Sequence, residues 1–261
     1  MKIALVSLDQ VWEDKKANQI KCQIYIEQAS KLNCELIIFP EMTLTGFSMN
    51  TKLIAEKPNK SCSIEFFSQQ ARHNNIPIAF GMVFEKEDKA TNNLVIIDQT
   101  GNLLSNYAKI HPFSFSGEDN YYSGGNELSS CQIEEASFGL TICYDLRFPE
   151  IFQALSGNCN IVLNIANWPE KRVRHWNALL EARAIENQIF MIGVNRKGID
   201  GNNHQYVKSS SIYNPLGEIM APLYTDSDMD IYDLNLGDAD SARKSFPMKQ
   251  DRRTEFYKSI L

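Results

Sequence analysis

The sequence has no closely spaced pair of cysteines and no apolar run long enough to cross a membrane. Its six cysteines lie far apart, at positions 22, 34, 62, 131, 143 and 159, and none sits near a histidine at zinc-finger spacing. A chain of 261 residues with 43% apolar residues has enough core to fold without disulfide bonds. We therefore expect reduced thiols and a cytoplasmic protein.

Positive charge is not in excess either. The chain has 26 basic and 32 acidic residues, which gives a formal net charge of −6. This balance argues against a general surface for nucleic acid or for an anionic membrane. The expected partners are small molecules or other protein chains. The opening residues, MKIALVSLDQ, have too short an apolar run for a signal peptide, and no small-residue cleavage site follows them.

No linker, low-complexity segment or internal repeat interrupts the chain. We therefore predict a single domain over residues 1–261. The polar residues 245–261 are expected to form a C-terminal tail that packs on a neighbour or runs over the surface.

Short apolar runs alternate with segments of helical spacing, which predicts a layered α/β fold. Strands are expected at 2–8, 35–39, 76–84, 93–98, 103–110, 137–143, 160–165, 189–195, 209–214, 218–221 and 230–234. Helices are expected near 14–33, 61–75, 146–155 and 173–188. The first of these helices places Ala17, Ile20, Ile24 and Leu32 at roughly helical spacing.

Most of these strands are apolar on both faces. This pattern favours two sheets packed face to face, with the helices outside them. A doubly wound single sheet is the simpler alternative, but Gly101 and Gly217 mark hairpins that a purely parallel sheet would lack.

One stretch, FGLTICYDLRF at 138–148, combines a strand with an abrupt change of structure. The strand ends at Cys143, and a helix can begin near Leu146 or Arg147. A thiol at such a corner projects from the end of the sheet, beside free backbone N–H groups that suit an oxyanion. The simpler interpretation is a cysteine that acts only as a small buried apolar residue.

Three residues with different chemistry share one local pattern. Glu41, Lys109 and Cys143 each stand at the end of an apolar strand, where a loop begins. In α/β proteins ligands bind outside the carboxyl ends of the strands, so the three can meet there. A carboxylate can take the proton of the thiol, and an ammonium can stabilise the oxyanion that forms when sulfur attacks a carbonyl. Taken singly, the simpler interpretations are favoured, namely Glu41 as a helix cap and Lys109 as a solvated surface residue.

The chain resembles the nitrilase, or carbon–nitrogen hydrolase, superfamily. The resemblance rests on FPEM at 39–42, YAKIH at 107–111 and ICYDLRFPE at 142–150, and it covers all but about the last fifteen residues. It implies an αββα sandwich, in agreement with the layered pattern, and dimers that pack helices face to face. It implies no metal and no organic cofactor.

The same resemblance assigns the family's Glu-Lys-Cys set to Glu41, Lys109 and Cys143. The family's frequent second glutamate is best matched by Glu118, with Asp119 as a rival in a loop of variable length.

A narrower resemblance is to the omega-amidase branch, which hydrolyses the terminal amide of 2-oxoglutaramate, 2-oxosuccinamate and similar 2-oxoacid amides. Its signs are GFSM at 46–49, NWP at 167–169, HWNALL at 175–180, ARAIENQ at 182–188 and GVNR at 193–196. The alternative is another amidase of the superfamily, or an N-carbamoyl hydrolase, acting on a different small amide.

The mechanism that we expect is a hypothesis at this stage. Glu41 takes the proton of Cys143, whose sulfur attacks the amide carbonyl, while Lys109 and the backbone N–H of Tyr144 hold the oxyanion. Glu41 then protonates the departing ammonia and activates the water that cleaves the thioester. Glu118 orients Lys109 or the substrate amide.

A 2-oxoacid amide carries a carboxylate, so its pocket needs a cation. Arg172 and Arg174 follow the NWP segment and offer guanidinium groups, although a solvated helix start is an equally good interpretation. Phe47 and Trp168 are candidates for the pocket walls, or simply core residues.

Other charged residues near the corner are expected to be structural. We interpret Asp145, Arg147 and Glu150 as ion-paired scaffolding. Arg183 and Glu186, three residues apart on one helix, are expected to form an ion pair.

Three rival interpretations remain open. The first is a Cys-His enzyme that uses His111, two residues after Lys109. The second is a non-enzymatic binding protein on the same scaffold. The third is a transferase that passes the acyl group to an acceptor other than water.

Overall fold

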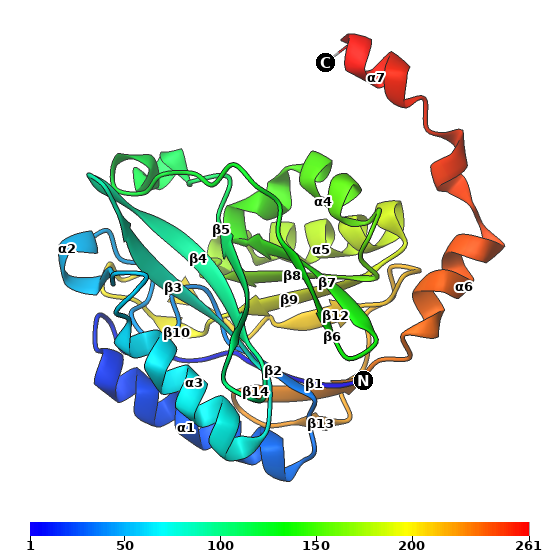
Figure 1. Cartoon of the computed structure of the whole chain (residues 1–261). Helices are drawn as coiled ribbons and strands as arrows, with labels where there is room; N and C mark the ends of the chain where they lie inside the picture. The colour runs from blue at the N-terminus through cyan, green and yellow to red at the C-terminus, as the bar shows by residue number, and fades with distance from the viewer. Residues whose placement is uncertain (261) are drawn as a thin grey trace.

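The apolar runs of the sequence form two large β-sheets (Figure 1). We describe the protein from a computed structural model that covers residues 1–260; Leu261, the last residue of the predicted tail, lies outside the described residues. The first sheet runs in the order β13 (Tyr224–Thr225), β14 (Met229–Asp233), β1 (Lys2–Val6), β2 (Leu36–Ile38), β3 (Ile78–Lys86), β4 (Lys89–Ile97), β5 (Leu103–Ala108).

The second sheet has five strands and packs against the first. Its order is β12 (Ser211–Tyr213), β9 (Phe190–Asn195), β8 (Ile161–Ala166), β7 (Ala136–Ile142), β6 (Ser130–Ile133). A separate small hairpin is made by β10 (Gly198–Ile199) and β11 (Gln205–Tyr206).

Strand β1 shows why its residues are apolar without alternation. Successive side chains of a strand point to opposite faces of the sheet. Ile3 and Leu5 enter the core between the two sheets, whereas Ala4 and Val6 enter the core under the outer helices. Both faces of the strand are therefore buried, which requires a continuous apolar run.

Helices cover the outer face of each sheet, as Figure 1 shows. Helices α1 (Lys15–Lys31) and α3 (Cys62–Asn74) pack on the seven-stranded sheet, and α4 (Pro149–Leu155) and α5 (Val173–Asn187) pack on the five-stranded sheet. Side-chain caps fix two of the helix starts: Asp14 accepts a hydrogen bond from Ala17 N, and Ser61 accepts one from Ile64 N. The order of layers is helices, sheet, sheet, helices, which confirms the predicted arrangement.

Strand direction explains how distant residues come together. β1, β2 and β3 are parallel, and antiparallel hairpins then lead through β4 to β5, so β5 again runs in the direction of β3. β7, β8 and β9 are parallel in the second sheet. The residues that follow β2, β5, β7 and β8 all leave their strands at carboxyl ends.

One predicted strand is wrong. Segment 218–221 is not a strand, because only Ile219 pairs, through a single bridge to Tyr213. On α1, Ile20 and Ile24 face solvent with 66% and 58% exposure. The buried face of α1 carries Asn18, Cys22, Ile26 and Ala29 instead.

The end of the chain leaves the body of the molecule in Figure 1. Helix α6 (Gly237–Ser245) is followed by η5 (Met248–Asp251) and by α7 (Thr254–Ile260), which is exposed along its length. Lys249 Nζ donates to Ser156 O at 2.8 Å and holds the first part of this segment to the end of α4. The single domain with a tail at 245–261 stays a prediction. Among the described residues no helix is long and apolar enough to cross a membrane.

Candidate active site

Glu41, Lys109 and Cys143 come together at the carboxyl ends of β2, β5 and β7. Lys109 Nζ lies 3.2 Å from Glu41 Oε1, and both side chains are almost completely buried. The charges of Glu41 and Lys109 both act on the Cys143 thiol, which is held at the same place. The structure thus assembles the three groups that the sequence places 68 and 34 residues apart.

Glu118 is the second carboxylate of the site. Its Oε2 and Oε1 lie 2.8 and 3.0 Å from Lys109 Nζ, and the side chain is fully buried. The backbone N–H of Phe113 also donates to Glu118 Oε2 at 2.5 Å. Asp119, the rival from the sequence, is exposed. The structure therefore places Glu118, and not Asp119, beside the lysine.

Two asparagines that the sequence did not single out as site residues contact Glu41. Asn92 Nδ2 donates to Glu41 Oε1 at 2.7 Å, and the backbone N–H of Asn167 donates to Glu41 Oε2 at 2.8 Å. Asn167 follows β8, so its place at a strand end was a usable signal. Asn92 lies inside β4, where nothing in the sequence marks it.

Burial makes the thiol hard to ionise. Cys143 keeps some exposure to the pocket, yet protein surrounds its sulfur, and this burial raises the pKa of the thiol well above its usual value. The nearby Glu41 carboxylate raises that pKa further, and the Lys109 ammonium offsets only part of the effect. At neutral pH Cys143 is therefore a thiol, and its activation needs a base.

The lysine and the second glutamate respond differently to the same burial. Burial by itself lowers the pKa of Lys109, but the Glu118 and Glu41 carboxylates outweigh it and hold the pKa above its ordinary value. Burial raises the pKa of Glu118, and Lys109 compensates only in part because the Glu41 charge is also near. Two carboxylates thus share one permanently charged ammonium.

The backbone turns sharply at the thiol. Cys143 has φ = 47°, in the left-handed region that side chains other than glycine rarely adopt. The predicted helix starts here as the 3-10 turn η3 (Cys143–Arg147), before α4. Asp145 Oδ2 accepts from Ile142 N at 2.9 Å, and Arg183 donates to Leu146 O from Nε at 3.2 Å and Nη2 at 3.0 Å. These bonds hold the corner in its strained conformation.

The charged residues around the corner divide into two groups. Asp145 is scaffolding, as expected, and the predicted pair of Arg183 with Glu186 is confirmed at 2.9 Å. Arg147 is not part of this scaffold. It lines the pocket, with its guanidinium 4.9 Å from the Trp168 ring. Our interpretation of Arg147 as ion-paired scaffolding is therefore wrong. Glu150 is exposed.

An open pocket of about 580 Å³ leads to Cys143. All four residues predicted to contact a ligand line it, namely Phe47, Tyr144, Trp168 and Arg172. Phe47 lies over the ammonium of Lys109, with Nζ 5.4 Å from the ring centre. Arg174, the alternative cation from the sequence, is exposed and does not line this pocket.

The pocket is also lined by side chains that the sequence analysis did not predict there. Asp200, His204 and Tyr206 reach it from the β10–β11 hairpin, a segment for which no strand was predicted. Tyr206 donates to Asp200 Oδ2 at 2.8 Å. Three basic side chains line the pocket besides His204: Arg147, Lys171 and Arg172. Asp200 is the single acidic residue among the lining residues.

His111 belongs to the scaffold side of the corner. Its Nδ1 lies 2.8 Å from Asp145 Oδ1, and its backbone N–H donates to the same oxygen at 3.0 Å. The ring stacks on Phe148 with centroids 3.8 Å apart. The imidazole is thus occupied by Asp145, whereas the charge of the Glu41 carboxylate acts on the thiol.

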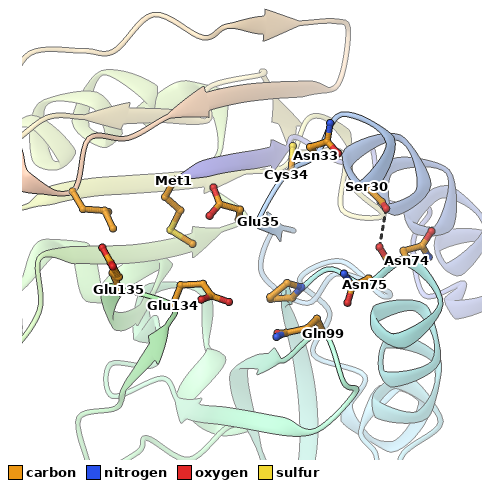
Figure 2. A pocket seen from close by; sticks show the side chains of 12 residues that line it. Met1, Ser30, Asn33, Cys34, Glu35, Asn74, Asn75, Gln99, Glu134 and Glu135 are labelled. Atoms are coloured by element: carbon orange, nitrogen blue, oxygen red, sulfur yellow. Dashed lines mark hydrogen bonds between the residues drawn. The ribbon is translucent and has the colours of Figure 1, made fainter.

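A larger cavity, of about 710 Å³, lies at the opposite ends of the strands (Figure 2). Figure 2 shows Met1, Glu35, Glu134 and Glu135 around it, with the hydrogen bond from Ser30 to Asn74 at one side. Its thiol, Cys34, has a pKa raised to about 11 by burial, and the nearby Lys2 charge only partly offsets this. This cavity does not join a thiol to a buried base and an ammonium. Among residues 1–260 no group of histidine, cysteine and acidic side chains is arranged to hold a metal ion.

Comparisons with known proteins agree with this geometry. A model of the carbon-nitrogen hydrolase family matches residues 2–244. An omega-amidase of Yersinia enterocolitica is 33% identical over 221 residues, which cover 85% of this chain and 84% of the relative. A 2-oxoglutaramate amidase of Bacillus subtilis is 29% identical over 258 residues, or 98% of both chains.

A solved structure shares the fold over nearly its whole length. It is a CN-hydrolase superfamily protein from Xanthomonas campestris, determined with an arsenic adduct in its active site. Its TM-score is 0.89 at 27% identity, with 97% of each chain covered. The predicted αββα architecture is thereby confirmed.

Proposed function

The chain belongs to the carbon–nitrogen hydrolase family and is a hydrolase that acts on amides, and we propose that it releases ammonia from the terminal amide of small 2-oxoacid amides. Examples of such substrates are 2-oxoglutaramate and 2-oxosuccinamate. The observation that carries the proposal is the convergence of Cys143, Glu41 and Lys109 at the base of a pocket rich in cations. Relatives named omega-amidase and 2-oxoglutaramate amidase support this substrate class.

The first chemical step forms a thioester. Because the Cys143 thiol is protonated at rest, Glu41 takes its proton as sulfur attacks the amide carbonyl. The oxyanion is stabilised by the Lys109 ammonium and by the backbone N–H of Tyr144. The C–N bond then breaks, Glu41 returns the proton to nitrogen, and ammonia leaves.

The second step consumes water. Glu41 takes a proton from the water that attacks the thioester, and Cys143 leaves as the thiol with that proton. Glu118 holds Lys109 in place through its two short contacts and keeps the ammonium charged. One carboxylate thus serves both steps, and the products are ammonia and a dicarboxylate.

The cations of the pocket supply the substrate selectivity. Arg172 stands with its guanidinium 5.5 Å from the Phe113 ring, and Arg147 stands over Trp168. A guanidinium pairs with a carboxylate through two parallel hydrogen bonds. We assign the carboxylate of the 2-oxoacid amide to Arg172, with Arg147 as the second cation. Phe47 and Trp168 wall the rest of the pocket.

A panel of substrates with ammonia detection tests the proposal. It contains 2-oxoglutaramate, 2-oxosuccinamate, glutamine, asparagine, butyramide, an N-carbamoyl amino acid and a nitrile. We expect the highest kcat/KM for the two 2-oxoacid amides. Fastest turnover of the N-carbamoyl compound would instead establish the alternative, an N-carbamoyl hydrolase.

Matched arginine variants test the selectivity. Arg172→Leu is expected to lower kcat/KM for 2-oxoglutaramate by roughly 10- to 100-fold, the usual effect of losing a charged hydrogen bond. It should leave butyramide, which has no carboxylate, within about threefold of the wild-type value. Equal losses on both substrates would show that Arg172 supports the fold and does not select the carboxylate.

We also propose that the protein is a homodimer. Ile185, on α5, is 47% exposed and packs against Gly217, and Leu216 and Ile219 on either side of that glycine are 66% and 65% exposed. A second copy of this helix face would bury them. Light scattering after size exclusion should give twice the chain mass for the wild type and one chain mass for Ile185→Asp. A monomeric wild type would refute the dimer, and Ile20→Asp on α1 is the control.

The free thiols bear on the compartment. The structure has six free cysteines and the described residues contain no disulfide. Reduced thiols favour a reducing compartment, so we propose the cytoplasm. Cell fractionation tests this, and recovery of the protein only from an oxidising compartment would contradict it.

A further inference from the structure

Asn92 occupies a central place among the charged groups of the site. It lies on β4, its side chain is 1% exposed, and its amide nitrogen bridges the two carboxylates. Nδ2 donates to Glu41 Oε1 at 2.7 Å and to Glu118 Oε1 at 3.2 Å. The backbone carbonyl of Asn92 also accepts from the N–H of Lys109 at 2.8 Å. One residue therefore contacts Glu41, Glu118 and Lys109.

The hydrogen bonds of Glu41 show what this bridge does. Oε1 accepts from both Lys109 and Asn92, and Oε2 accepts from the backbone N–H of Asn167. A carboxylate has about four lone-pair directions. Three are used by the protein, so the one that remains, on Oε2, is left for the proton that Glu41 exchanges.

From this we propose that Asn92 is a positioning residue, which fixes the Glu41 carboxylate so that its remaining lone pair receives the proton of Cys143 and later that of water. This inference rests on the proposed role of Glu41 as the proton acceptor. Asn92 does not line the pocket that leads to Cys143.

A primary amide is the residue type that this position requires. It offers two N–H donors without adding charge to a cluster that already holds two carboxylates and one ammonium. Asn92 Oδ1 has no hydrogen-bond partner among the described residues. An amide turned the other way would direct this oxygen at two carboxylates, so the donors fix its orientation.

The charged and titratable groups around Glu41 come from several elements. Lys109 follows β5, Glu118 begins η2 (Glu118–Asn120), and Cys143 begins η3. Tyr122 is also near: burial is the main cause of the raised pKa of its phenol, and the charges of Glu118 and Glu41 raise that pKa further. Loss of the Asn92 donor disfavours the ionised Glu41 carboxylate among these groups.

The test replaces Asn92 by leucine, which has a similar shape and no donor. We expect Asn92→Leu to lower kcat for ammonia release by roughly 10- to 100-fold, the usual effect of losing a hydrogen bond to a charged group. KM should stay within about threefold, because Asn92 does not line the pocket. The acidic limb of the pH profile of kcat/KM should move to higher pH, because removing a hydrogen-bond donor from a carboxylate favours its protonated form.

The chain supplies a matched control in the next residue. Asn93 is also buried, at 3% exposure, but neighbouring residues of a strand face opposite sides, and its amide donates to Asn106 at 2.8 Å. Asn93→Leu should keep kcat within about threefold and leave the pH profile in place. Equal losses in the two variants would overturn the proposal, because the effect would then be one of strand stability. Wild-type kcat in Asn92→Leu would overturn it as well.

A second variant and a second probe keep the test decisive. If Asn92→Leu does not fold, the isosteric Asn92→Asp replaces it. A third carboxylate should lower kcat at pH 8 by at least tenfold, and wild-type kcat would overturn the proposal.

Acylation by p-nitrophenyl acetate, with Cys143→Ala as the blank, follows the reaction of the thiol without any amide substrate. A wild type that takes the acetyl group but releases no ammonia from amides would refute the proposed function. Asn92 is then judged from the acetylation and deacetylation rates, which Asn92→Leu should lower and Asn93→Leu should not.

Discussion

Replacing Lys109 by methionine tests the electrostatics of the buried site. Glu41, Lys109 and Glu118 are each at most 1% exposed, and together they carry one net negative charge when both acids are ionised. The Lys109→Met protein keeps an unbranched side chain as far as Cε and removes the only ammonium that contacts the two carboxylates among the described residues. The site then holds two buried negative charges and no counter-ion.

The size of the effect follows from the distances. The nearest carboxylate oxygens of Glu41 and Glu118 are less than about 6 Å apart, because both accept from Asn92 Nδ2, at 2.7 and 3.2 Å. Two charges about 5 Å apart repel by about 3 kcal/mol at an effective dielectric constant of 20. Removing one partner from a buried ion pair typically costs about 3–5 kcal/mol. We therefore expect Lys109→Met to lower the free energy of unfolding by about 3–5 kcal/mol at pH 8.

The pH dependence gives the sign of the effect. Burial already raises the pKa of Glu118 in the wild-type protein, and loss of the ammonium raises it further above the unfolded value of about 4.3. A carboxyl group with a raised folded-state pKa contributes stability that is complete below its unfolded pKa and is lost as the pH rises through the folded pKa. The deficit of Lys109→Met should therefore be largest at pH 8 and smaller at pH 5.5.

Urea unfolding followed by circular dichroism at pH 5.5 and pH 8 measures this difference. Adding Glu118→Gln to Lys109→Met should restore about 2–3 kcal/mol at pH 8, because one of the two charges is then gone. Lys16→Met, at an exposed position on α1, is the control and should change stability by less than about 0.5 kcal/mol. An equal deficit of Lys109→Met at both pH values would refute the reasoning.

Three further variants probe the site. Glu41→Gln should lower kcat by roughly 10²- to 10⁴-fold with the fold retained, the range for loss of a general base, and a variant with near-wild-type kcat would remove Glu41 from the mechanism. His111→Asn should keep ammonia release within about tenfold, because His111 pairs with Asp145; complete loss would favour the Cys-His mechanism. Gly81→Ala should destabilise by about 1–3 kcal/mol and displace Glu41, because a β-carbon there would lie 2.3 Å from Met42 N; unchanged melting and kcat would contradict this close packing.

The sequence predicted the layers of the fold because both faces of its strands are buried. The largely apolar run 160–165 predicts a buried strand, and β8 spans Ile161–Ala166. Strand β4 was harder to delimit. It was expected to begin at Asn93, but it begins at Lys89, because the long hairpin with β3 recruits polar residues that have no strand signal of their own.

Helix faces could not be chosen from spacing alone. On α1 two apolar rows compete, one with Ile20 and Ile24 and the other with Cys22 and Ile26. The second row packs on the sheet, although isoleucine at 20 and 24 made the first row more apolar. The direction in which α1 meets the sheet decides the outcome, and no local pattern encodes that direction.

Some residues of the candidate site were predictable from the sequence and others were not. Glu41, Lys109 and Cys143 follow recognisable motifs at strand ends, so their convergence was predictable, whereas the family resemblance pointed to Glu118 with Asp119 still a rival. Asn92 was not, because its role depends on which face of β4 meets the two carboxylates. The lining residues of the β10–β11 hairpin and Arg147 were missed for the same reason: only tertiary packing brings them to the pocket.

Ammonia release from 2-oxoglutaramate by Cys143→Ala, beside Cys62→Ala as the control thiol, tests the central claim most directly. Cys62 is exposed at the start of α3, whereas Cys143 opens on the pocket. The thioester mechanism predicts that Cys62→Ala matches the wild type and that Cys143→Ala falls to the rate of the buffer blank. Wild-type ammonia release by folded Cys143→Ala protein would contradict it.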